Sequence, residues 1–99
     1  MDVEIGYHDA DYGYVNINFP RGCDNNHQAW AAEKCALKIA SAVAQYNNEY
    51  ANLKGQDAIW ESSDEVTWWD ASGDEVEEWE DWNTVTTFQC AIFKTKKGE

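Results

Sequence analysis

Residues 24–55 read DNNHQAWAAEKCALKIASAVAQYNNEYANLKG, and this stretch predicts one long helix. An Asp or Asn at residues 24–26 can cap the N-terminus of the helix, and Gly55 is placed to end it just beyond Leu53. At about 100° per residue, one face of the helix collects apolar side chains and suits packing across a sheet. These are Ala31, Cys35, Ile39, Ala42, Val43, Tyr46, Tyr50 and Leu53, whereas Trp30 and Leu37 fall roughly on the other side.

The segments on both sides of the helix have the two-residue period of β-strands. Val3, Ile5 and Tyr7, and later Val15, Ile17 and Phe19, alternate with polar residues around a turn at residues 8–11, which predicts an N-terminal hairpin. Strand character returns at residues 58–61 and 65–70, before a turn at 71–74. Residues 84–93 predict a strand with Phe88, Cys90 and Ile92 on one face, whereas residues 75–82 fit a helical turn about as well as a strand.

The predicted fold class is α+β, in the order ββαβββ. We expect an antiparallel sheet of about four to five strands with one long helix packed across it. At 99 residues and 43% hydrophobic content, the chain suits a single compact acidic domain over residues 1–99.

Charge is distributed unevenly along the chain. The formal net charge is −12, and between Lys54 and Lys94 there are eleven carboxylates, five of the six tryptophans and no lysine or arginine. Nucleic-acid binding needs basic side chains to displace condensed counterions, so nucleic acid and anionic membranes are poor partners for this chain. A positively charged protein is the natural partner.

The candidate partner-binding residues are the acids of this base-free stretch, one tryptophan and two acids of the N-terminal turn. They are Asp57, Glu61, Asp64, Glu65, Asp70, Asp74, Glu75, Glu77, Glu78, Glu80, Asp81, Trp69, Asp9 and Asp11. On a strand, Glu75 with Glu77 and Glu78 with Glu80 would form rows about 6.6 to 6.8 Å apart. The alternative interpretation is a solvated face that is acidic for solubility.

The tryptophans have the same two interpretations, as interface anchors or as core. We expect Trp60 and Trp68 in the core. Because Trp69 follows Trp68, it must point to the opposite face of a strand and is the best exposed candidate, whereas Trp79 and Trp82 stay undecided.

No catalytic or metal-binding motif stands out, so we expect neither an enzyme nor a cofactor. The spacing after His8-Asp9-Ala10-Asp11 does not continue as a calcium loop, and His27 has no neighbours with zinc spacing. Three cysteines without Cys-x-x-Cys spacing, and a start without a basic or apolar leader, predict a cytoplasmic protein with reduced thiols. No apolar run approaches the roughly 18 to 20 residues of a membrane span.

Small size, extreme acidity, an aromatic-rich body and the lack of a catalytic motif resemble the phage-encoded inhibitors that mimic DNA, the anti-CRISPR and anti-restriction proteins. The resemblance is one of size and charge; it matches no signature motif and transfers no site. It implies a protein of the host-cell cytoplasm that occupies the basic DNA-binding channel of a defence complex, with a CRISPR surveillance complex as first choice. The implied partner is a basic DNA-binding protein or ribonucleoprotein complex.

Two further classes stay open at the level of the sequence. One is an immunity protein or antitoxin that plugs a basic nuclease site, which needs a compact acidic knob instead of extended rows of charge. The other is a viral structural or assembly protein that docks a basic partner and self-associates through Trp30 and Leu37. For the chain itself we expect a monomer or weak dimer.

Overall fold

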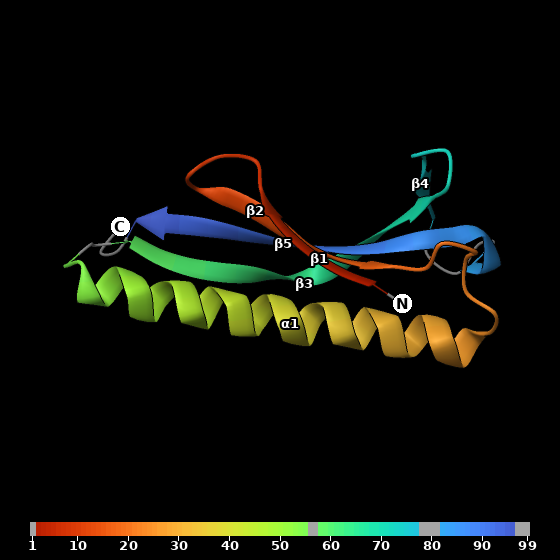
Figure 1. The fold of residues 1–99 in the computed structure, drawn as a ribbon, viewed down its shortest axis with the longest axis horizontal. Coiled ribbons are helices and arrows are strands. Elements are labelled where there is room, and N and C mark those ends of the chain that lie inside the picture. The colour runs from red at the N-terminus through yellow and green to blue at the C-terminus, as the bar shows by residue number, and fades with distance from the viewer. Residues whose placement is uncertain (1, 56–57, 78–81, 97–99) are drawn as a thin grey trace.

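One long helix lies across one face of a twisted antiparallel sheet in the computed structural model, which describes residues 2–55, 58–77 and 82–96 (Figure 1). The elements are β1 (Asp2–Tyr7), β2 (Tyr12–Asn18), α1 (Asn26–Leu53), β3 (Ala58–Asp70), β4 (Glu75–Val76), a 3-10 turn (Trp82–Thr84) and β5 (Val85–Lys96). The strands lie side by side in the order β1-β2-β5-β3-β4. The predicted α+β fold with ββαβββ order is confirmed.

The core forms where the central strand β5 and its neighbours β2 and β3 face the helix. Val15 lies opposite Cys90 and Ile17 opposite Phe88, and all four side chains are fully buried. The alternation predicted for β5 is therefore confirmed. Trp68 of β3 completes this layer, with its ring centroid 5.4 Å from that of Phe88.

The helix begins and ends where the sequence predicts. Among the three candidate caps it is Asn25 whose side chain accepts a hydrogen bond of 2.8 Å from the backbone N–H of Gln28. At the other end, Gly55 has a φ of 67°, a left-handed conformation that favours glycine, and its N–H bonds to the carbonyl of Asn52.

The buried face of α1 differs from the predicted one. It is a stripe of small side chains, namely Ala29, Ala32, Ala36, Ala40, Ala44 and Ala51. The prediction was wrong for Ala31, Ala42, Tyr46, Tyr50 and Leu53, which are exposed. The large side chains of β2, β3 and β5 already fill the layer beneath the helix, so alanines allow the close approach that tyrosines would prevent.

The residues at the border of the alanine stripe are half-buried. Cys35, Ile39 and Val43 pack against the core from one side. Leu37, which the helical period placed on the outer side, also packs against the core.

Strand β3 runs through two segments that the sequence separates. Its pairing with β5 shifts register between Ser62 and Val66, so residues 63–65 form an irregularity inside one continuous strand. Strand β4 is short, and pairs Val76 with Trp68 and Glu75 with Trp69. The predicted strand row of Glu75 and Glu77 does not form, because Glu77 lies beyond the end of β4.

Candidate partner-binding face

The β3–β4 hairpin displays one group of the predicted acids. Asp74, Glu75 and Glu77 are exposed, whereas Asp70 is half-buried. The Oδ1 atom of Asp70 accepts hydrogen bonds from the backbone N–H groups of Ser72, at 2.9 Å, and Asp74, at 3.0 Å. Asp70 therefore shapes the turn that presents the other three carboxylates.

A second group lies along β3. Glu61 is exposed opposite Phe93, on the face of the sheet that the helix does not cover. Asp64 and Glu65 are exposed at the strand irregularity, beside a hollow of about 260 Å³ that Glu33 of α1 also lines. Position 33 was missed by the sequence interpretation, because a single acid on a long helix carries no signal of its own.

The acids at the irregularity influence the neighbouring core. Burial is the main cause that raises the pKa of the Cys90 thiol to about 11, and the negative charge of Asp64 adds to it. The carboxylate of Glu33 accepts a hydrogen bond of 3.2 Å from the indole N–H of Trp68. Glu33 is thus engaged with the core, whereas Asp64 and Glu65 face solvent.

The core positions predicted for Trp60 and Trp68 are confirmed, whereas the exposure predicted for Trp69 is wrong. Trp68 is buried and Trp60 is half-buried against the core. Trp69 points to the opposite face from Trp68, as expected, but it is half-buried there, and its indole N–H donates to Gln89 Oε1 at 3.2 Å. The exposed tryptophan among the described side chains is Trp30, at 52%.

The remaining pair of predicted acids lies at the other end of the sheet from the β3–β4 hairpin (Figure 1). The Oδ1 atom of Asp9 accepts a hydrogen bond of 2.7 Å from the backbone N–H of Asp11. The carboxylate of Asp11 lies 3.5 Å from Nζ of Lys94 and forms an ion pair with it. This pairing reduces the charge that Asp11 offers to a partner.

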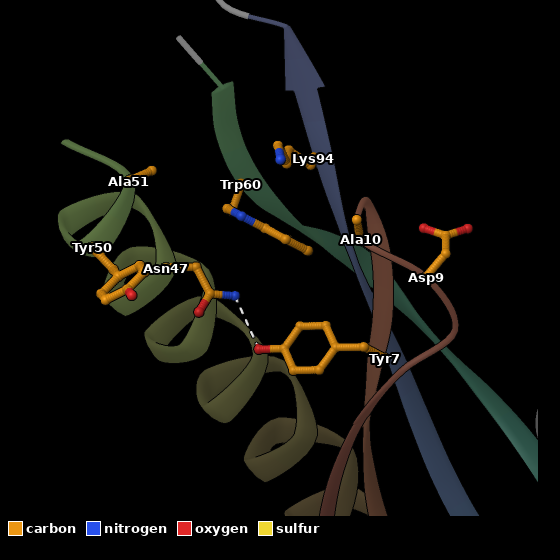
Figure 2. A pocket seen from close by; sticks show the side chains of 8 residues that line it. All are labelled: Tyr7, Asp9, Ala10, Asn47, Tyr50, Ala51, Trp60 and Lys94. Carbon is orange, nitrogen blue, oxygen red and sulfur yellow. Dashed lines mark hydrogen bonds between the residues drawn. The ribbon is translucent and has the colours of Figure 1, made fainter. Parts of the chain in front are cut away.

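A hollow of about 290 Å³ opens beside this turn, and Figure 2 shows its lining. The rings of Tyr7 and Trp60 meet edge to face at 5.8 Å, and the Tyr7 hydroxyl accepts a hydrogen bond of 3.1 Å from Asn47. Asp9 and Lys94 bring opposite charges to its rim. The hollow therefore does not extend the acidic surface.

The acids between Glu61 and Glu77 have no basic counterpart in the part of the chain that the structure describes. The one ion pair among the side chains that the structure describes is that between Lys94 and Asp11. Asp57, Glu78, Glu80 and Asp81 lie outside the described residues, as do Trp79 and the side chain of Trp82. We use the name acidic face for the exposed carboxylates that follow β3 and the β3–β4 hairpin, of which Asp64 and Glu65 border α1. These are Glu61, Asp64, Glu65, Asp74, Glu75 and Glu77.

Neither histidine forms a metal cluster among the described residues, in which no group of three or more His, Cys, Asp or Glu side chains could hold an ion. His8 stacks on Tyr12 at 5.5 Å, and His27 stacks on Trp30 at 5.9 Å. Both imidazoles are thus engaged in ring contacts on the surface.

Comparison of the chain with protein-family models, curated proteins and solved structures finds no match. Within the described residues, α1 is not apolar enough to cross a membrane. Inferences about function therefore depend on the geometry and charge of the chain itself.

Proposed function

We propose that the protein is an inhibitor that mimics the charge of DNA and blocks the DNA-binding groove of a host defence complex in the host-cell cytoplasm. The observation that carries this proposal is the acidic face, six exposed carboxylates without an ion-pair partner among the described residues. Like charges held together repel one another and cost stability. A basic groove would offset that cost on binding.

The spacing of charge on β-structure supports mimicry of a nucleic-acid backbone. Alternate residues of a strand lie on one face about 6.6 to 6.8 Å apart, roughly twice the about 3.4 Å of helix axis per phosphate along one strand of duplex DNA. Glu61 of β3 and Glu75 of β4, which is paired with Trp69, lie on the same face of the sheet, and Asp64 and Glu65 lie between them in the sequence. An extended basic groove, such as that proposed for a CRISPR surveillance complex, can contact several of these carboxylates at once.

The target can be identified by capturing partners with the tagged protein from a host that carries CRISPR and nuclease systems, followed by a challenge with duplex DNA. We expect recovery of a basic DNA-binding complex that the duplex displaces and that more salt releases, because exposed charges are screened by ions. A captured complex that still binds duplex DNA with unchanged affinity would contradict the proposal.

One observation favours a second candidate, an immunity protein that plugs a basic nuclease site. Asp74, Glu75 and Glu77 cluster on one protruding hairpin, which has the compact shape that such a plug needs (Figure 1). Replacing Glu61 by Gln separates the candidates. An extended mimic should lose affinity for its target when the charge of Glu61, distant from the hairpin, is removed. A plug that inserts only the hairpin should keep its affinity.

A further inference from the structure

Strand β1 forms an open edge of the sheet. In the order β1-β2-β5-β3-β4 it has a neighbour on one side only, and no described residue pairs with its outer side. Its sequence DVEIGY contains no proline, lysine or bulge, three of the features with which proteins protect sheet edges, and its two charged side chains, Asp2 and Glu4, lie on the face away from the helix. The opposite edge consists of the short β4, which belongs to the acidic hairpin, and of the part of β3 that β4 does not reach.

The backbone groups that β1 leaves free follow from the register. His8 N–H donates to the Tyr12 carbonyl at 2.8 Å, and hydrogen-bonded pairs alternate along an antiparallel ladder. Residues 2, 4 and 6 therefore bond to β2. The N–H and C=O groups of Val3, Ile5 and Tyr7 point away from the sheet.

The side chains of these same three residues lie on the helix side of the sheet, yet the helix does not cover them. They are 48%, 48% and 51% exposed. Between β1 and α1 lies a groove of about 360 Å³ with Ile5 and Tyr7 on its floor and Ile39, Ala42, Val43, Tyr46 and Asn47 on its wall. None of these lining residues is charged, although the chain carries a net charge of −12.

We propose that β1 is the interface for a second copy of this chain, with the two β1 strands paired antiparallel about a two-fold axis at Ile5. In this register, Ile5 faces its own copy and Val3 faces Tyr7 of the other chain, so every outward N–H and C=O of the three residues finds a partner. The two grooves then join into one apolar floor.

Charge also selects this register. On the uncovered face, Glu4 lies opposite Gly6 of the other copy, and Asp2 lies opposite His8. Shifting the axis to Glu4 would place two glutamates directly opposite each other, which is unfavourable, and would leave Tyr7 without a strand partner. Pairing at Ile5 places the two acidic faces at the far edges of the joined sheet, where their repulsion is smallest.

The exposed apolar area of β1 and the groove can supply a substantial part of a dimer interface. An aromatic side chain offers about 150 to 250 Å², so Tyr7 and Tyr46, at 51% and 68% exposure, present roughly 180 to 300 Å² together. Val3, Ile5, Ile39 and Ala42 add aliphatic surface beside them. A standard interface buries about 800 Å² per partner, and groove and edge together supply a substantial part of it.

The test is the mass in solution, measured by light scattering over a concentration series at about 0.15 M salt, where the screening length is about 8 Å. We expect the mass to rise toward twice 11.3 kDa, and the N–H groups of Val3, Ile5 and Tyr7 to become protected from hydrogen exchange as it does. Ile5→Lys places two ammonium groups together at the axis and should abolish the dimer. Ile59→Lys, at a half-exposed Ile of β3, is the matched control and should retain it.

A mass that stays at that of one chain would overturn the proposal, as would a dimer that survives Ile5→Lys. So would a dimer in which the three amides exchange freely, because another surface would then hold it. Circular dichroism and urea unfolding of both variants establish that each monomer remains folded. None of these readouts depends on a DNA-binding target, so the interface and the inhibitor proposal fail separately.

Discussion

Asn48 of α1 holds the backbone of Trp60 in β3 through two hydrogen bonds. Its Oδ1 accepts from the Trp60 N–H at 2.5 Å, and its Nδ2 donates to the Trp60 carbonyl at 2.9 Å. Within the described residues, strand β4 pairs with β3 at Trp68 and Trp69 and does not reach this part of the strand. A side chain of the helix thus takes the place of a neighbouring strand.

Replacing Asn48 by Ala should destabilise the fold by about 1 to 3 kcal/mol, because two half-buried backbone groups lose their partner. The free energy of unfolding in urea measures this loss. Asn52→Ala, at an exposed position one turn further along α1, is the control and should change stability by less than about 0.5 kcal/mol. Equal effects of the two substitutions would contradict the role assigned to Asn48.

A second prediction concerns the alanine stripe of α1. Ala36 is fully buried against the sheet, so Ala36→Leu should cost about 1 to 3 kcal/mol through overpacking. Ala42 lies on the face that the sequence period favoured but is exposed, so Ala42→Leu should be tolerated. Thermal unfolding of the two variants compares the faces directly, and the reverse ranking would mean that the bulky face packs on the sheet.

The helix shows why the fold could be predicted from the sequence more fully than its packing. Caps at Asn25 and Gly55 are local signals, and so is the strict alternation at Phe88, Cys90 and Ile92. Which helix face is buried depends instead on the space left above the sheet. Tyrosine and leucine bury more apolar area than alanine, but only alanine fits in the space between the helix and the sheet.

The candidate site, like the helix, could be predicted from the sequence only in part. Charge alone predicts exposure for Glu61, Asp74 and Glu75, and they are exposed. The turn-forming role of Asp70 and the pairing of Asp11 with Lys94 depend on folded geometry that a single sequence does not reveal. The strand through residues 62–64 was missed because Ser-Ser-Asp resembles turn chemistry.

Asp70 offers a test that separates a structural carboxylate from displayed ones. Asp70→Ala removes the acceptor of two backbone N–H bonds and should cost about 1.5 kcal/mol or more, with faster amide exchange at Ser72 and Asp74. Asp74→Ala removes an exposed carboxylate and should leave stability unchanged or slightly increased, since like charges repel. Unchanged exchange in Asp70→Ala would contradict the assignment.

The three thiols should react at different rates. Burial raises the pKa of Cys23 and of Cys90 to about 11, helped by Asp24 and Asp64, whereas Cys35 is only half-buried. Alkylation by iodoacetamide, followed by mass spectrometry of peptides, should therefore modify Cys35 first. Modification of Cys90 at the same rate would show that the core is open there.

The same shifts predict alkaline destabilisation. A pKa raised on folding from 9.0 to about 11 favours the neutral thiol in the native state, so this contribution is complete below about pH 9 and is lost toward pH 11. Urea unfolding at about pH 8 and about pH 10.5 measures the loss. The Cys23→Ala, Cys90→Ala double variant should lose less stability over this range than the native chain.

The proposed inhibitor places its acidic face where duplex DNA would otherwise bind, and direct competition tests this most sharply. The measurement is binding of labelled duplex DNA to a purified CRISPR surveillance complex, with the protein as competitor at low and moderate salt. We expect the native chain to displace DNA and the Glu75→Gln, Glu77→Gln variant to require at least about tenfold more protein, the equivalent of about 1.4 kcal/mol. The control Asp24→Asn, Glu49→Gln removes the same charge at exposed positions outside the face and should compete like the native chain. Equal competition by both variants, or binding that leaves DNA in place, would contradict the account.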